Sequence, residues 1–108
     1  MTKKTLVLGA STNPNRYSNI AIKRLRNKGV SVVALGLRKG NVVDVAIDNE
    51  RKDYKNIDTI TLYLNPKRQE SYFNYIINLQ PRRVIFNPGT ENKEFEKSIQ
   101  NSVKSIKS

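Results

Sequence analysis

The sequence contains no cysteine and no histidine in its 108 residues. Without cysteine the chain has no disulfide framework, no thiolate nucleophile and no cysteine-based zinc site. Without histidine it also lacks the commonest metal ligand and the commonest acid–base group at neutral pH. These two absences exclude most hydrolytic and thiol-redox chemistry, so we expect neither a metal site nor catalytic residues.

The sequence also lacks a long apolar run, and no segment approaches the ~18 consecutive apolar residues that a membrane-spanning helix needs. The stretch 1–4, followed by the strand-like stretch 5–8, is too short to be a signal peptide. We therefore expect a soluble, cytoplasmic protein without a membrane partner. The length predicts one domain over residues 1–108, with a Ser-, Lys- and Asn-rich tail at 98–108 that frays or departs from regular structure.

Negative charge is scarce, because 20 Lys and Arg residues face 9 Asp and Glu residues and the net charge is +11. Residues 1–43 contain nine basic residues and no acidic one. Such a field suits nucleic acid, an anionic membrane surface or a phosphorylated small molecule, although it also serves solubility alone. Nucleic acid is the less favoured partner, because the chain has no recognised nucleic-acid-binding motif and its cations are not interleaved with aromatic residues.

Short apolar runs rich in β-branched residues alternate with helical periods, a pattern typical of parallel βαβ units. Strands are predicted at 4–9, 31–36, 42–47, 59–64 and 83–86, and helices at 17–28, 66–79 and 91–106. The first helix is expected to bury a stripe made of Tyr17, Ile20, Ala21 and Leu25. The predicted class is α/β, a Rossmann-like three-layer sandwich whose mostly parallel sheet has helices on both faces.

The predicted strand order is 42–47, 31–36, 4–9, 59–64 and 83–86, with 42–47 as an edge strand. This order places the topological switch point between strands 4–9 and 59–64. Ligands of open α/β sheets bind beside such a point, at the carboxyl ends of the strands. The loops that could form a site are therefore 9–18, 37–40, 65–68 and 87–90.

The loop after the first strand has the composition of a phosphate site. Gly9 permits a sharp turn and a close approach of ligand, and Arg16 lies at the start of a helix, where an anion is favoured. The hydrogen-bonding residues between and beyond them are Ser11, Thr12, Asn13, Asn15 and Ser18. Since the full G-x-G-x-x-G pattern is absent, an ordinary polar loop remains the alternative.

The loop after the second strand carries Arg38 and Lys39 and no carboxylate. An NAD-binding domain places Asp or Glu at this point, to hold the ribose hydroxyls. Two cations favour a ribose with an additional phosphate, as in NADP or coenzyme A (CoA), and an exposed turn is the structural alternative. An NADP-dependent enzyme is the second choice, because the chain has no cysteine and no histidine to carry its chemistry.

The segments 5–18, 58–66 and 83–92 together resemble the small single-domain CoA-binding proteins of bacteria. These are relatives of the CoA-binding domain in succinyl-CoA synthetase, and the resemblance runs from about residue 3 to residue 96. It implies a Rossmann-like domain that binds CoA or an acyl-CoA. It also implies a binding module without catalytic activity.

The resemblance further implies which residues bind CoA. Around the diphosphate it places Gly9, Ala10, Ser11, Asn13, Arg16 and Ser18. Near the adenosine and its 3′-phosphate it places Arg38 and Lys39. On the pantetheine side it places Asn65, Pro66, Asn87, Pro88 and Gly89.

The chain departs from the family near its end, where similar proteins continue into a further strand with a Cys-Thr-Leu-Val type of sequence. Residues 98–108 do not match that strand, so we expect it to be missing or altered. Strand 83–86 would then be a sheet edge with the apolar sequence Val84-Ile85-Phe86. Because exposed apolar edges tend to pair, this predicts a symmetric homodimer through that edge.

Overall fold

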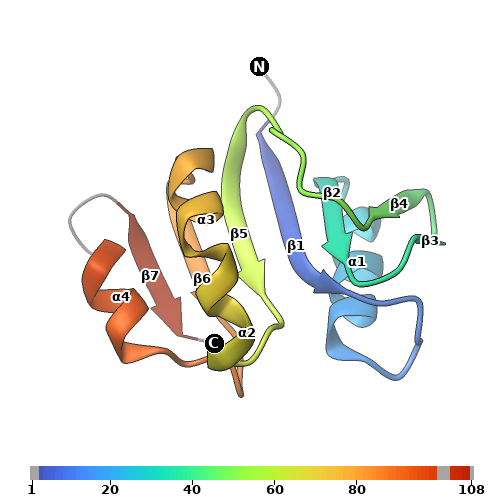
Figure 1. Ribbon diagram of the computed structural model, residues 1–108. Coiled ribbons are helices and arrows are strands. Elements are labelled where there is room, and N and C mark those ends of the chain that lie inside the picture. Colours follow the sequence, from blue (N-terminus) through green and yellow to red (C-terminus); the bar gives the residue numbers. More distant parts are fainter. Residues whose placement is uncertain (1–2, 100–102, 108) are drawn as a thin grey trace.

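A mostly parallel sheet runs through the residues that the computed structural model describes, 3–99 and 103–107 (Figure 1). The strand order across the described sheet is β3-β4-β2-β1-β5-β6-β7. Only the β3–β4 pair is antiparallel among these strands. The strands are β1 (Lys4–Ala10), β2 (Ser31–Gly36), β3 (Gly40–Val42), β4 (Val45–Asp48), β5 (Ile57–Leu62), β6 (Arg83–Phe86) and β7 (Lys104–Lys107).

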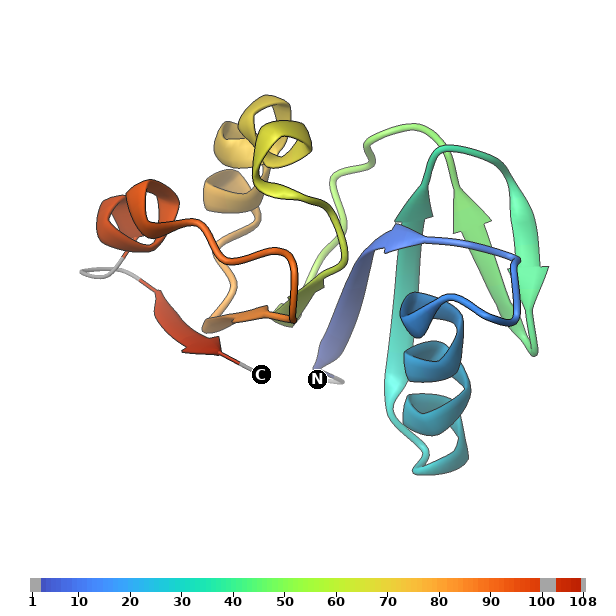
Figure 2. The ribbon, with the colours of Figure 1, turned by 90° about the horizontal axis from the view of Figure 1, so that it is seen from below.

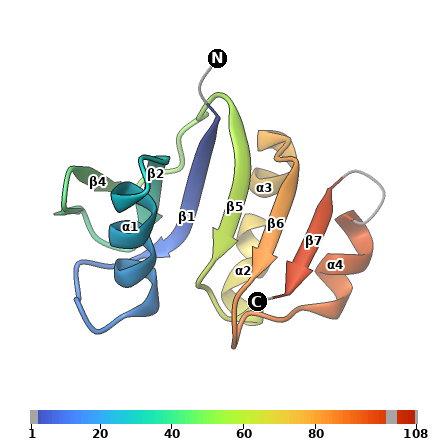
Figure 3. The ribbon, with the colours of Figure 1, turned by 180° about the vertical axis from the view of Figure 1, so that it is seen from behind.

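Helices lie on both faces of the sheet, which confirms the predicted Rossmann-like α/β class (Figures 2 and 3). One face carries α1 (Tyr17–Asn27), which packs over β1 and β2. The opposite face carries α2 (Pro66–Gln69), the 3₁₀ turn η1 (Glu70–Tyr72), α3 (Phe73–Leu79) and α4 (Lys93–Ile99). In the part of the chain that the structure describes, no helix has the length and apolar character required to cross a membrane.

The core divides into two buried clusters, one on each face of the sheet. Side chains alternate between faces along a strand, so Val7 packs with Ile22 of α1, whereas Leu6 and Leu8 pack with Ile76 on the other side. All of these side chains are almost completely buried. The predicted central strands therefore bury both faces, as parallel strands in a three-layer fold do.

Two local predictions at the first helix and the edge strand are wrong. Tyr17 is the first residue of α1 and is 78% exposed, whereas Ile22, more than one turn further along, is the fully buried apolar residue of that helix. The stretch 42–47 is not one strand. It turns at Val43 and Asp44, so that β3 and β4 form a hairpin, and β4 alone pairs with β2.

The last strand was predicted to be missing or altered, and the first of these alternatives is wrong: the strand is present, with a sequence that differs from the family's. The last helix ends at Ile99 rather than near residue 106, and β7 follows it and pairs in parallel with β6. Phe95 and Ile99 are buried in the core as predicted, and so is Val103, which continues their spacing. Residues 104–107, Lys-Ser-Ile-Lys, nevertheless form a strand, because the open edge of β6 offers backbone hydrogen-bond partners that a longer helix would leave unpaired.

Strand β6 is thus an interior strand, and the reason for predicting a dimer through its edge no longer applies. Of the predicted tail 98–108, residues 100–102 and 108 lie outside the described residues. Residues 104–107 form β7.

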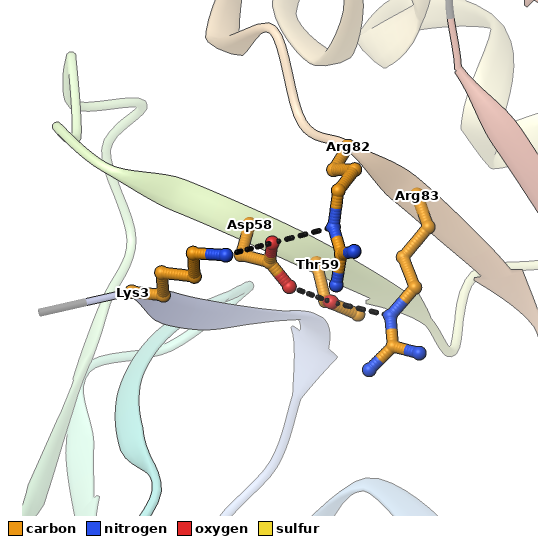
Figure 4. A network of polar contacts seen from close by, with 5 residues as sticks. All are labelled: Lys3, Asp58, Thr59, Arg82 and Arg83. Carbon is orange, nitrogen blue, oxygen red and sulfur yellow. Dashed lines mark hydrogen bonds and ion pairs between the residues drawn. The ribbon is translucent and has the colours of Figure 1, made fainter.

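A polar network lies at the amino ends of β5 and β6, opposite the ends where a ligand was expected (Figure 4). Asp58 accepts hydrogen bonds from Thr59 Oγ1 at 2.8 Å and from Arg82 Nε at 2.9 Å, and Lys3 Nζ lies 4.0 Å away. Arg83 Nε donates to Thr59 Oγ1 at 2.7 Å. The bond from Thr59, followed by that from Arg82, holds the pKa of the Asp58 carboxyl below its ordinary value despite the opposing effect of burial.

We expect Asp58→Asn to lower the free energy of unfolding at pH 7 by about 1 kcal/mol, because the contact with the exposed Arg82 is partly screened by water. A lowered pKa means that this stabilisation is present above the unfolded pKa of about 4 and is lost as the pH falls through the folded value. Urea unfolding of both proteins should therefore converge below about pH 4. Asp53→Asn, which removes an exposed pair with Lys55, is the control and should change the free energy of unfolding little. If the difference in unfolding free energy between Asp58→Asn and wild type stayed the same at every pH, the role assigned to the Asp58 carboxylate would be contradicted.

Candidate functional site

A cleft of ≈ 700 Å³ opens at the carboxyl ends of β1, β2, β5 and β6. Its walls come from residues 9–13 and 16–18 after β1, 35–38 at the end of β2, 63–65, 68 and 72 after β5, and 88–90 after β6. The cleft therefore lies at the topological switch point between β1 and β5. Its volume falls in the range of about 300–1,000 Å³ that is usual for small-molecule sites.

The structure brings most of the predicted binding residues into this one cleft. The lining contains Gly9, Ala10, Ser11, Asn13, Arg16, Ser18, Arg38, Asn65, Pro88 and Gly89. They come from four separate segments of the chain, and the sheet brings these segments together at a common end. Whether each residue contacts a ligand stays a prediction.

Three predicted residues do not line the cleft. Lys39 is an exposed residue of the connection between β2 and β3, outside the cleft lining. Pro66 is the first residue of α2 and borders a separate hollow with Phe73. The Asn87 amide is used within the fold, since its Nδ2 donates to Thr61 Oγ1 at 2.7 Å and to the Leu62 carbonyl at 2.8 Å.

The loop after β1 is shaped by its own short polar side chains. Asn13 N–H donates to Ser11 Oγ at 3.1 Å, and Asn15 N–H donates to Asn13 Oδ1 at 3.0 Å. The buried Asn19 of α1 donates from Nδ2 to the Ser11 carbonyl at 3.0 Å. These bonds position the loop at the start of α1 without using the Arg16 side chain.

The start of α1 has the features of an anion site. Arg16 is the N-cap residue, but its side chain makes no capping hydrogen bond, and the first turn contains no acidic residue. The unpaired N–H groups at the start of a helix and the helix dipole both favour negative charge. An anion in the cleft would thus meet the helix start and a guanidinium group together.

The charged side chains in the described lining of the cleft are all cationic. Arg16, Arg38 and Arg68 all line it, and among the ion pairs of the described residues none involves any of the three. By contrast, Arg26 forms a bidentate pair with Asp44 outside the cleft. The described lining contains no acidic side chain, so these three guanidinium groups are available to an anionic ligand.

Two glycines allow the strand ends to approach closely beneath the cleft. A Cβ atom at Gly36 would lie 2.2 Å from the Ala10 carbonyl oxygen, and one at Gly9 would lie 3.0 Å from the Tyr63 carbonyl carbon. Gly9 also has a φ of +96°, a conformation that residues with a side chain rarely adopt. The backbone itself therefore forms the floor of the cleft at these positions.

Gln69 joins two walls of the cleft, although sequence reasoning did not identify it. Its fully buried amide donates from Nε2 to the Leu64 carbonyl at 2.8 Å and to the Thr90 carbonyl at 2.7 Å. Its Oε1 accepts a bond of 3.3 Å from Asn92. The loops after β5 and β6 are thus held to each other through one side chain of α2.

Sequence reasoning did not select several other lining residues, although three of them lie in the loops 9–18, 37–40 and 65–68 that it proposed. Tyr17 and Leu37 lie on the rim and are 78% and 66% exposed. Arg68 and Tyr72 come from α2 and η1, one and two helical turns after Asn65. Asn65 caps this helical segment, since its Oδ1 accepts a hydrogen bond from Arg68 N–H at 2.9 Å. Helical spacing counted from Asn65 would have pointed to Arg68 and Tyr72.

The fold and the cleft define an open α/β domain with a cleft at its switch point whose described charged lining residues are all cationic. A family model described as a CoA binding domain matches residues 3–106, and the chain belongs to this family. Comparison with curated proteins gives no match.

Solved structures agree with this assignment. The crystal structure of an uncharacterized protein is 45% identical in sequence to this chain. The match covers 100% of this chain and 90% of that protein, with a TM-score of 0.94. A hypothetical protein from Pyrococcus horikoshii OT3 is 25% identical over 98% of this chain and 76% of its own, with a TM-score of 0.85. A conserved hypothetical protein from Pyrococcus furiosus, 24% identical over 97% of this chain and 92% of its own, shares the fold with a TM-score of 0.84.

We expect Gln69→Met to lower the free energy of unfolding by about 2–3 kcal/mol, because the Leu64 and Thr90 carbonyls would lose their buried donor while the side-chain volume stays similar. Chemical denaturation would measure the change. Lys67→Met, at an exposed position of the same helix, is the matched control and should stay within about 0.5 kcal/mol of wild type. Equal stability of the two variants would show that Gln69 does not hold the two loops together.

Proposed function

We propose that this protein binds CoA, or an acyl-CoA, in the cleft at the carboxyl ends of the parallel strands and acts as a binding module rather than an enzyme. The observation that carries the proposal is the cationic cleft itself, in a chain of the CoA binding domain family. Three arginines that take part in none of the described ion pairs gather in it with a helix start that has no side-chain cap, and the described lining has no acidic residue.

The distribution of cations along the cleft suits the phosphates of CoA. Arg16 and the start of α1 would hold the diphosphate, since the helix N–H groups and the guanidinium converge there. Arg38, at the end of β2, would bind the ribose 3′-phosphate. Arg68 adds a third positive group on the wall formed by α2.

The other half of the cleft suits the less polar pantetheine arm. Its walls contain Tyr63, Leu64, Tyr72 and Pro88, which offer apolar surface together with a few polar groups. Asn65 and the backbone of Gly89 provide hydrogen-bonding groups for the amides of the arm. A thiol or an acyl group at the end of the arm would then lie near the loops after β5 and β6.

Binding without catalysis is supported by the side chains available. The sequence provides no histidine or cysteine, and the described lining of the cleft provides no carboxylate. Arginine cannot give up its proton at ordinary pH, so these groups bind charge rather than move protons. The tyrosines of the lining are the remaining acid–base groups, and general bases that work at neutral pH are usually His, Asp or Glu.

Isothermal titration calorimetry with CoA, dephospho-CoA and NADP tests the proposal. We expect CoA to bind, and dephospho-CoA to bind about tenfold more weakly, because one charge-assisted contact to the ribose phosphate is lost. Arg38→Ala should remove most of that difference. Lys97→Ala, which removes an exposed charge on α4 outside the cleft lining, should preserve it.

Two outcomes of this titration would contradict the proposal. Binding of NADP without binding of CoA would assign the cleft to a nicotinamide cofactor. Equal affinities for CoA and dephospho-CoA in the wild type would remove Arg38 from the phosphate site.

We expect Arg16→Ala to weaken CoA binding by about tenfold while the melting temperature without ligand stays nearly unchanged. The Arg16 side chain makes no capping bond and belongs to no core cluster, so its removal costs the free fold little. Calorimetry and thermal unfolding measure the two effects, with Lys23→Ala, an exposed cation of the same helix, as the control. Loss of stability by more than about 1 kcal/mol with unchanged affinity would show that Arg16 is a structural residue.

A further inference from the structure

The connection between β4 and β5 crosses the face of the sheet opposite α1 and contacts the helices that follow β5. Tyr54 of this connection packs against the larger core cluster, and its hydroxyl bonds to Asp48 at the end of β4. Lys52 Nζ also contacts Asp48 at 3.0 Å. Lys52 and Tyr54 therefore fix the connection to Asp48 and to the core without any contact with η1.

Arg51 extends from this anchored connection to η1. Its Nη1 donates to the Ser71 carbonyl at 2.6 Å and its Nη2 donates to Ser71 Oγ at 3.2 Å. Its Cζ atom lies 3.9 Å from the centroid of the Tyr72 ring. Two hydrogen bonds and a stacking contact thus hold the guanidinium group and the ring together.

Tyr72 lines the ligand cleft, whereas Arg51 does not. The ring also contacts Tyr75 edge-on, with centroids 6.4 Å apart, and Tyr75 hydroxyl donates to the Lys52 carbonyl at 2.5 Å. Burial, above all, raises the pKa of Tyr75 to about 12, so this hydroxyl keeps its proton as a donor at physiological pH. The connection is thus linked to Ser71 and Tyr72 of η1 through Arg51, and to Tyr75 of α3, whose ring contacts that of Tyr72, through Lys52.

The short 3₁₀ turn η1 interrupts the helical segment between α2 and α3. A 3₁₀ turn has poorer internal hydrogen-bond geometry than an α-helix, so its side chains depend more on contacts from outside. We propose that Arg51 is a positioning residue for the ligand cleft, which holds the Tyr72 ring in the orientation that binds CoA. This inference rests on the proposed function.

A double-mutant cycle tests the inference, with CoA affinities measured by calorimetry on wild type, Arg51→Ala, Tyr72→Ala and the double variant. We expect each single variant to bind CoA about fivefold more weakly. The double variant should bind no more weakly than Tyr72→Ala, because Arg51 acts through that ring. Losses that multiply in the double variant would overturn the inference.

Two further variants separate positioning from charge. Lys55→Ala removes the same charge from the same connection, at a residue whose described ion pair is with Asp53, and should bind CoA as wild type does. Arg51→Lys keeps the charge but loses the planar fork and the stacking, so it should bind as weakly as Arg51→Ala. Wild-type affinity in Arg51→Lys would show that charge alone matters and would overturn the inference.

A measurement without CoA keeps this test separate from that of the proposed function. In proton NMR spectra of the free protein, Arg51→Ala should shift the ring signals of Tyr72 and leave those of Tyr63, another cleft residue, in place. Unchanged Tyr72 signals would overturn the positioning role even in a protein that binds CoA. Failure of the wild type to bind CoA would overturn the proposed function, whatever the Tyr72 signals show.

Discussion

The close packing of three strand ends is the constraint on which the cleft depends. A side chain at Gly36 would collide with the Ala10 carbonyl, and one at Gly9, near the end of β1, would press against the Tyr63 backbone. The chain leaves β1 toward one face and β5 toward the other, because the right-handed crossovers from these two neighbouring strands lead in opposite directions along the sheet. The cleft is the space between these diverging segments, and its floor is backbone.

The acidic residues explain why the positive charge is available in this cleft. Asp44 pairs with Arg26, Asp58 pairs with Arg82, and Asp48 bonds to Tyr54 and Lys52, all outside the cleft lining. These carboxylates stabilise a hairpin, the amino ends of two strands and the connection before β5. The arginines at the opposite ends of the strands lack such partners among the described ion pairs. Part of the net charge of +11 is thus concentrated in the cleft, where it produces a positive local potential.

The two faces of the sheet are covered by different means. Helix α1 covers β1 and β2 on one face, as Figure 3 shows. On the other face, Val33 and Leu35 of β2 belong to the same cluster as Tyr54 of the connection between β4 and β5. The connection between β4 and β5 is irregular, so it is held in place by side-chain contacts. One of these contacts, from Arg51 to Tyr72, reaches the wall of the cleft.

Local patterns in the sequence predicted the central strands and the loops that form the cleft, and the family resemblance completed the ten predicted residues that line it. Runs such as residues 5–8 and 59–62 bury both faces, and Gly, Asn and Pro mark the loops that follow them, so these features depend on neighbours along the chain. Tertiary structure decided the rest. Residues 104–107 became a strand because β6 provided an unpaired edge, against a spacing that also fitted a helix. Gln69 meets Thr90 and Arg51 meets Tyr72 across some 20 residues of chain; such contacts leave no periodic signal, since they exist only once the sheet has brought the loops together.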